Sequence, residues 1–595
     1  MMKKYYILSK NTTVESYQSI FNSFELKDIE IVSYDRAVNH VFVDNIVSSK
    51  DSLILFIPTI LDPFNAYSYD GVEYALKYYC HFVSIKKEDF QIILLGIEDE
   101  SAFWKHCEYS SFLRCPHVSY LKNNVYPIKE YLTHIESVVF DMDWTYCIER
   151  LKHVNVKKPA SYKTHHSITN EWSIYRWSKY LGIENIAIQR DIEEFLYFNY
   201  LKAIYPESKI NDPKSFYIAE KGKVLLIDDE VGKGWDTFFK SLFENSPDIT
   251  FDSIGENFKT LSQKEIVDQT TTKLETFDPD LVLLDLRLHD EDFDTTKKAS
   301  ELTGTIIFDV IKEKINKGIQ IVVFSASNKV WNYLPFASDG VVLKESPENS
   351  MKLNYTQECI SNLRKTIENC LKRKILKVFY SKIERVENLI LNSNCFEDKT
   401  EEIVGGLEIA FDLLTRGVDE NEYFSYSYLQ LFLVIEEYAK LSSVFDIADN
   451  DVYLCNKEKR YRILKDKKQI GNGKMYSYDS VLSYDSPKKH FVFNRDSYDT
   501  RFIETNFRIS ALLIFKYNFN ESSEKGWDII CENRNTKAAH PKQEKITTED
   551  IHQILDFMIF FFDENNVNWR PISDAFHERS IEDGITLLQE KYCNL

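Results

Sequence analysis

Acidic side chains follow two apolar segments of this 595-residue chain, and a hydroxyl and a lysine follow two more. Asp228 and Asp229 end the segment KVLLIDDE, and Asp285 ends LVLLDLRL. Further along, Ser325 ends IVVFSAS and Lys344 ends VVLKE. Three carboxylates at close range repel one another unless a cation lies among them, and Mg²⁺ is the hard, oxygen-seeking candidate. The lysine and the hydroxyl can then hold the oxygens of a phosphoryl group.

These four segments must be strands of one sheet if the side chains are to meet. Between residues 217 and 350, short apolar runs alternate with amphipathic stretches, a βα rhythm typical of a parallel sheet covered on both faces. Ligands bind at the carboxyl ends of the strands in such sheets, so we expect the five side chains to converge on one edge. A solvated turn is the alternative explanation of the Asp-Asp pair, but four matching strand ends in order disfavour it.

At these residues the chain resembles the receiver domain of two-component response regulators, over roughly residues 220–350. The resemblance implies that Asp285 is the phospho-acceptor, that Ser325 and Lys344 bind the phosphoryl group, and that a histidine kinase is the partner. It also implies a Mg²⁺ cofactor, whose ligands would be Asp228, Asp229, Asp285 and the backbone of Arg287.

Three features depart from the receiver pattern. An acidic insert, HDEDFDTTKKASELTG, follows Leu288. Val341 stands where the family has an aromatic residue, and Glu345 stands where it has proline. We therefore expect phosphorylation to be retained and the family's aromatic switch to be replaced, with the signal passing through the insert or the face around Trp331.

A second group of chemically capable residues lies near the end of the chain, in the stretch RNTKAAHP. Arg534 can bind a phosphate through its planar fork, and His540 can take or give a proton near neutral pH. Such a pair suits cleavage of RNA by its own 2′-hydroxyl, which needs no metal. The two residues are six positions apart, so a helix must bend or end near His540 to bring them together, and Pro541 favours such an end.

At these residues the C-terminal part resembles the HEPN superfamily of helical domains, many of which are metal-independent ribonucleases. The resemblance implies that Arg534, Asn535 and His540 are catalytic, that no cofactor is needed, and that the site forms across a homodimer acting on RNA. Two alternatives stay open. An Arg–His spacing of this kind arises by chance in long chains, and some HEPN domains are inactive and bind only nucleotides or partners.

Composition restricts the class of protein. The net charge of −20 argues against sequence-independent binding to a long duplex, and no helix-turn-helix or basic stripe supports transcriptional control. The apolar runs are too short to span a bilayer, and the start MMKKYYILSKN lacks the features of a secretion signal. Ten scattered cysteines without a CxxC pair are typical of a reducing compartment. We expect a cytoplasmic protein without a membrane partner.

Changes in the sequence pattern divide the chain into several domains. The predicted fold class is multidomain α/β plus α, with receiver-like (flavodoxin-like) parallel sheets followed by an all-helical C-terminal domain. Residues 1–132 repeat the βα rhythm without an acidic pair, which indicates a degenerate receiver-like domain that cannot be phosphorylated. The other predicted parts are an aromatic-rich helical connector (133–216), the receiver domain (217–350), a helical linker (351–399) and the HEPN-like domain (400–595).

The resulting hypothesis is a response regulator that is phosphorylated on Asp285 and controls a ribonuclease effector. This set of domains looks similar to regulators of bacterial phage-defence two-component systems. The alternative belongs to a different class: a non-enzymatic phosphate acceptor or scaffold that buffers or binds a partner histidine kinase.

Overall fold

The computed structural model describes most of the chain, in two compact units: residues 1–308 with 321–371, and residues 309–320 with 372–595. The described residues are 3–9, 29–33, 52–61, 68–87, 89–135, 143–158, 165–183, 195–205, 216–294, 296–326, 338–351, 354–448, 451–455, 460–467, 477–480, 483–485, 490–492, 497–498, 505, 508–509, 512–513, 516–517, 521–539 and 544–569. Each unit is described by itself.

The first sheet of the first unit contains five parallel strands in the order β2-β1-β3-β4-β5. Their bounds are β1 Lys3–Ser9, β2 Ile29–Ser33, β3 Ser52–Pro58, β4 Phe90–Gly96 and β5 Val118–Lys122. The described helices of this domain include α4 Asp70–Ile85, α5 Glu100–His106 and α6 Val125–Ile135. The apolar segments KKYYIL, IEIVSY, SLILFIP, FQIILLG and HVSYL predict a strand each, and all five strands are present.

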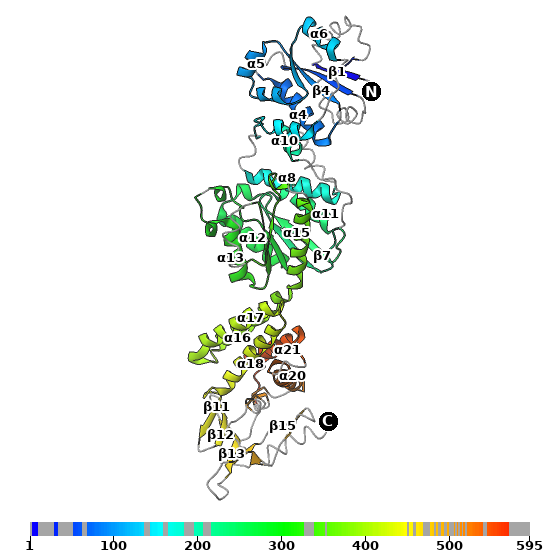
Figure 1. Cartoon of the computed structure of the whole chain (residues 1–595). Helices are drawn as coiled ribbons and strands as arrows, with labels where there is room; N and C mark the ends of the chain where they lie inside the picture. Colours follow the sequence, from blue (N-terminus) through cyan, green and yellow to red (C-terminus); the bar gives the residue numbers. More distant parts are fainter. Residues whose placement is uncertain are drawn as a thin grey trace. The chain divides into compact units, whose positions relative to one another are not determined.

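Helices cover both faces of this sheet, and side chains that alternate along each strand contact one face or the other. Leu55 on β3 belongs to the core shared with α4 and α5, whereas its neighbour Phe56 belongs to the cluster that includes Ile128 of α6. Successive side chains of a strand point to opposite faces, so a continuous apolar run such as SLILFIP is the sequence of a strand buried on both sides. Figure 1 shows these helices around the strands.

The second sheet repeats the same strand order, β10-β9-β8-β6-β7. Its strands are β6 Gly222–Ile227, β7 Ile249–Ile254, β8 Leu281–Leu284, β9 Gln320–Ser325 and β10 Gly340–Leu343. β6 pairs in parallel with β7 and β8, and β9 pairs in parallel with β10. In chain order both sheets follow the doubly wound arrangement 2-1-3-4-5, in which ligands bind outside the carboxyl ends of the strands.

The described helices around the second sheet include α11 Trp235–Phe243, α12 Gln263–Phe277, α13 Thr303–Val310 and α15 Tyr355–Lys372. Ser262 caps α12 through a reciprocal hydrogen-bond pair with Glu265, which fixes where this helix begins. Trp235 of α11 is fully buried against Phe324 of β9, with ring centroids 4.8 Å apart. Phe324 directly precedes Ser325, so this aromatic contact lies next to the end of β9.

Among the described residues between the two sheets in the sequence are the helices α7 Trp144–Leu151, α8 His165–Leu181 and α10 Leu196–Ile204. α10 packs on α4 of the first sheet domain, and α8 packs on α11 of the second. The aromatic residues of this connector are largely core residues: Trp172, Trp177 and Phe198 are fully buried.

The second unit is built mainly from helices: α16 Ile375–Ser393, α17 Thr400–Gly417, α18 Glu422–Lys440, α20 Glu521–Asn533 and α21 Thr548–Phe562. α17 contacts both α16 and α18, while α21 packs on α16, α18 and α20. The segment predicted as a linker, 351–399, is divided, because α15 belongs to the first unit and α16 to the second. No helix of the described residues combines the length and apolar character needed to cross a membrane.

The prediction of an all-helical C-terminal domain was wrong. An antiparallel sheet, β11-β12-β13-β14-β17, lies between α18 and α20 in the sequence, together with the strand pair β15-β16. The strands are β11 Phe445–Ala448, β12 Asp451–Cys455, β13 Arg460–Lys467, β14 Ser477–Ser480, β15 Ser483–Asp485, β16 His490–Val492 and β17 Ser497–Tyr498. Segments such as DVYLC and RYRILKDK carry the aromatic and branched residues favoured in strands, and polar residues separate them in the sequence.

Candidate functional site

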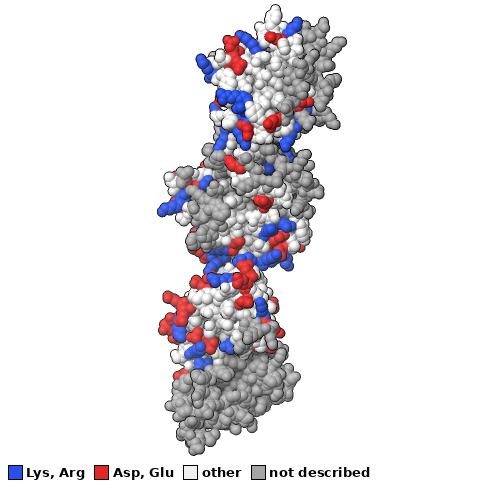
Figure 2. Space-filling view, in the orientation of Figure 1, with Lys and Arg blue, Asp and Glu red and all other residues white. Residues whose placement is uncertain are grey.

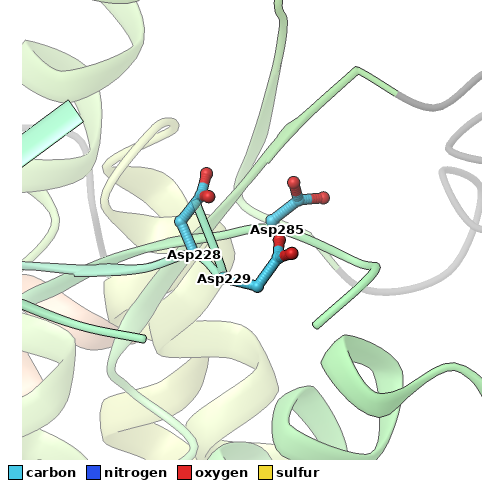
Figure 3. Close-up of side chains that lie close together, drawn as sticks. All are labelled: Asp228, Asp229 and Asp285. Atoms are coloured by element: carbon cyan, nitrogen blue, oxygen red, sulfur yellow. The ribbon is translucent and has the colours of Figure 1, made fainter. Parts of the chain in front are cut away.

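Three carboxylates meet at the carboxyl edge of the second sheet. Asp228 and Asp229 follow β6, and Asp285 follows the neighbouring strand β8. One oxygen of each carboxylate lies within 4.8 Å of one oxygen of each of the others, and all three residues are buried. Figure 3 shows the three side chains close together at the ends of these strands.

A lysine and a serine from the next two strands complete this acidic pocket. The Nζ atom of Lys344 lies 2.6 Å from Oδ2 of Asp228 and 3.2 Å from Oδ2 of Asp285. The hydroxyl of Ser325 donates to Oδ1 of Asp285 at 2.7 Å. The structure therefore brings together all five side chains that the sequence placed at strand ends.

The charges of the pocket are poorly balanced without a cation. Burial raises the pKa of Asp228 although Lys344 opposes the shift. Burial, together with the charges of Asp228 and Glu230, raises the pKa of Asp229 far above its usual range. Burial alone would lower the pKa of Lys344, but the charges of Asp228 and Asp285 outweigh it and raise this pKa. One buried ammonium thus faces a surplus of buried carboxylates, which a divalent cation would relieve.

Two further observations fit a hard cation at this place. Oδ1 of Asp229 is buried and has no hydrogen-bond partner among the described residues, while Nζ of Lys259 lies 3.9 Å from its other oxygen. A buried, unsatisfied carboxylate oxygen is costly unless a ligand takes it. The backbone N–H of Arg287 donates to Oδ1 of Asp285 at 3.3 Å, so the backbone of this residue lies at the pocket, and its role as a metal ligand stays a prediction.

Asp229→Asn tests this electrostatic account through stability. Because burial disfavours the charged form of Asp229, the neutral isostere should raise the melting temperature of the Mg²⁺-free protein by about 2–4 °C, equivalent to about 1 kcal/mol. The same change should abolish the stabilisation that Mg²⁺ gives the wild type. Calorimetry with and without Mg²⁺ measures both effects, with the exposed Asp268→Asn as the charge-matched control. A lower melting temperature, or retained Mg²⁺ stabilisation, would contradict the account.

Close glycine contacts mark equivalent positions in the two sheets. Gly304, the second residue of α13, lies so close to the end of β8 that an added Cβ would lie 2.2 Å from the carbonyl oxygen of Asp285. Gly71 occupies the same place in the first sheet domain, where a Cβ would lie 1.7 Å from the carbonyl oxygen of Pro58. Pro58 thus occupies in the first sheet the place that Asp285 occupies in the second, and the lack of phosphorylation in the first sheet domain stays a prediction.

The acidic insert after Leu288 is folded around one buried carboxylate. Asp292 is fully buried and accepts from the backbone N–H groups of Leu288, His289 and Thr303. Lys297 also donates to it at 2.8 Å. Asp292 thus holds the insert against the start of α13 through these hydrogen bonds.

In the C-terminal motif, α20 changes into a π-helical turn, Arg534–Ala538. The Arg534 guanidinium lies 5.5 Å from the ring centroid of Phe432, and its Nη1 donates to Oδ1 of Asn535 at 2.8 Å. Its Nε is buried without a hydrogen-bond partner among the described residues. His540 lies outside the described residues, so the structure shows the arginine and asparagine of the predicted set together and does not test the histidine.

The residue before Arg534 has a structural role that the sequence did not reveal. Asn533 is buried and donates to Asp550 of α21 at 2.9 Å, and Lys537 reaches the same carboxylate at 3.2 Å.

Replacing Asn533 with alanine should destabilise the protein by about 1–3 kcal/mol, because Asp550 loses a buried partner. Asn535→Ala is the matched control: Asn535 is exposed, so its loss should change the free energy of unfolding by less than about 0.5 kcal/mol. Urea titration measures both values, and equal costs would contradict this division of roles.

Two buried glutamates that were not predicted from the sequence lie beside the acidic pocket. Glu230 follows Asp229 and Glu345 follows Lys344, and both are almost fully buried. The sequence carried a signal for each, since a third acid follows the Asp-Asp pair and Glu345 replaces the expected proline. Trp331, the alternative centre for signalling, lies outside the described residues.

No family model matches the sequence, and no similar curated protein or solved structure is found for the chain. The functional conclusion therefore depends on the geometry and charges of the acidic pocket. A buried group of three carboxylates, one lysine and one hydroxyl at a strand edge suits the binding of a cation together with an anionic phosphoryl group.

Proposed function

We propose that the chain is a two-component response regulator that accepts a phosphoryl group on Asp285. One observation carries the proposal: Asp285 accepts from Ser325 and Lys344 while two more carboxylates lie beside it in a buried group. A hydroxyl and an ammonium on the acceptor carboxylate are already placed to bind phosphoryl oxygens once the group is attached. The partner that supplies the phosphoryl group would be a histidine kinase.

In the proposed reaction an Oδ atom of Asp285 forms a bond to phosphorus while the bond between phosphorus and the donor nitrogen breaks. The leaving imidazole keeps the electron pair of that bond, and it is released as a neutral ring because its other ring nitrogen carries a proton. A Mg²⁺ ion held by Asp228, Asp229, Asp285 and the backbone carbonyl of Arg287 would neutralise charge on the transferring group. Lys344 and Ser325 bind the remaining oxygens, so the site works by positioning and electrostatics.

For the output, we propose that the second unit is a HEPN-like ribonuclease that acts on RNA as a homodimer. Arg534 supports this, because it has a donor without a described partner and lies in a π turn, a feature frequent at functional sites. On the face drawn in Figure 2, basic and acidic side chains are interspersed over the described surface, with no continuous basic stripe there. A local anion site at Arg534 therefore suits the chain better than a broad nucleic-acid surface. Phosphoryl control of such an effector fits a role in bacterial antiviral defence.

A single experiment tests input and output together. The full-length protein is incubated with labelled RNA, with and without Mg²⁺ and phosphoramidate, a small phosphodonor. We expect a gain of one phosphoryl group by mass spectrometry and RNA cleavage that depends on it and is lost in His540→Ala. Uptake on Asp285 without cleavage under any condition would favour the non-enzymatic acceptor, a reading that the first sheet domain without an acceptor aspartate also suits.

A further inference from the structure

Helix α8 buries an unusually polar face. Asn170 and Ser173 are fully buried, and Arg176 is 7% exposed, alongside the fully buried Trp172 and Trp177. Buried polar groups need hydrogen-bond partners, so the partners of this face show what the helix is built to contact. They lie around the acidic pocket of the second sheet, although α8 precedes that sheet in the chain. Figure 1 shows α8 beside α11, on which it packs.

The first set of partners is at Glu345, the residue after the pocket lysine. Its carboxylate accepts from the indole N–H of Trp177 at 3.1 Å and lies 3.5 Å from Nε of Arg176. Its backbone carbonyl accepts from the Ser173 hydroxyl at 2.8 Å. Two hydroxyls outside α8 complete the shell of the carboxylate, those of Ser350 and Thr356. Three residues of α8 therefore hold the backbone and side chain that directly follow Lys344.

The second contact runs through aromatic rings. The Nζ atom of Lys344 lies 5.1 Å from the ring centroid of Trp235 and 4.8 Å from that of Phe324. The indole N–H of Trp235 donates to Oδ1 of Asn170 on α8 at 3.1 Å. The ring of Trp235 also packs edge-on against Trp177, with centroids 5.7 Å apart. A displacement of the Lys344 ammonium would therefore change its contact with the ring of Trp235, which α8 contacts through Asn170 and Trp177.

The third contact is at the acidic end of the pocket. Glu230, next to Asp229, accepts from the hydroxyl of Ser167 at 3.0 Å. Lys233 bridges Glu230 and Glu171 of α8, at 3.0 and 3.4 Å. α8 is therefore bound to the residues adjacent to the metal carboxylates as well as to the residue adjacent to the lysine.

From these contacts we propose that α8 is the element that responds to the state of the pocket, with Glu345 and Trp177 as positioning residues. The inference rests on the proposed phosphorylation of Asp285. Lys344 now lies between Asp228 and Asp285, and a phosphoryl group would draw its ammonium to new oxygens. Because Glu345 and Trp235 are tied to α8, that movement shifts the contacts of the helix. This route takes the place of the aromatic switch that Val341 removes.

The helices between the two sheets connect α8 with the first sheet domain of the same unit. Trp172 of α8 packs against Tyr205 at the end of α10, with ring centroids 6.5 Å apart. α10 in turn packs on α4 of the first sheet domain. A change in α8 therefore reaches the domain without an acceptor aspartate, which becomes the first recipient of the signal.

The test combines intact mass with amide hydrogen exchange on the full-length protein, before and after incubation with phosphoramidate and Mg²⁺. In the wild type we expect uptake of one phosphoryl group and a change of about five-fold or more in the exchange rate of residues 165–181. In Glu345→Gln we expect uptake to continue and the change in α8 to be lost. Trp177→Phe, which removes one N–H and keeps a ring, should have the same effect, and the exposed Glu244→Gln should behave as the wild type.

The outcomes separate this inference from the proposed function. Uptake in the wild type with unchanged exchange in α8 would overturn the relay and leave the acceptor site standing. A change in α8 that both variants retain in full would also overturn it. Failure of uptake in the wild type would overturn the proposed function and the relay with it.

Discussion

Asp285→Asn should reduce phosphoryl uptake from phosphoramidate to background, a loss of at least about 10³-fold. Asparagine keeps the shape of the side chain and can still bond to Ser325, but its amide oxygen is not a nucleophile. Removing one of three crowded carboxylates also relieves their repulsion, so the variant should fold. Loss of uptake then reports chemistry and not unfolding. Intact mass spectrometry in the presence of Mg²⁺ measures the uptake.

The insert provides the control for this variant. Asp290 lies five residues away, is exposed, and carries the same charge, so Asp290→Asn should leave uptake unchanged. Peptide mapping of the wild type should place the added mass on Asp285. Uptake that persists in Asp285→Asn would mean that another group is the acceptor, and the proposed function would then lose the observation on which it depends.

Arg534→Ala should reduce RNA cleavage by about 10²-fold or more, the usual loss when one donor to a developing anion is removed. The guanidinium is held over Phe432 and by Asn535, so it is positioned before any RNA binds. Arg534→Lys should also be strongly impaired, because an ammonium keeps the charge but lacks the planar fork. Initial rates on a labelled RNA, measured with the phosphorylated protein, give the loss.

Arg416 is a suitable control within the same unit. It is exposed, and its guanidinium lies 5.8 Å from the ring centroid of Tyr423, much as Arg534 lies over Phe432. Arg416→Ala removes the same charge and a similar ring contact, so it should cleave RNA at the wild-type rate. If both alanine variants lose activity equally, the loss reflects overall charge and Arg534 has no special role.

Much of the first unit follows from local patterns. Apolar runs bounded by amphipathic stretches predicted all five strands of the first sheet, because strands buried on both faces need continuous apolar sequence. The acidic pocket was predictable for a related reason. Once the segments are parallel strands, their carboxyl ends must share an edge, so residues as far apart as Asp228 and Lys344 meet.

The second unit was harder to predict because its strands are short and their register depends on partners elsewhere in the chain. β11 and β12 pair by a local antiparallel connection, but β14 also pairs with the distant β17. Strand formation of this kind is governed by cross-strand contacts more than by intrinsic preference. The helices of the same unit were found because their apolar stripes recur within each segment.

The sequence alone predicted which reactive side chains meet in the acidic pocket: two adjacent acids, a third aspartate, a serine and a lysine, each at the end of an apolar run. Tertiary structure decided what surrounds that chemistry. No local pattern indicates that Trp177 would bind Glu345, because the two lie 168 residues apart and meet only when α8 packs on the second sheet. The periodicity of apolar residues reveals which face of a helix or strand is buried. Which residues cover a buried polar face depends on how the whole unit packs.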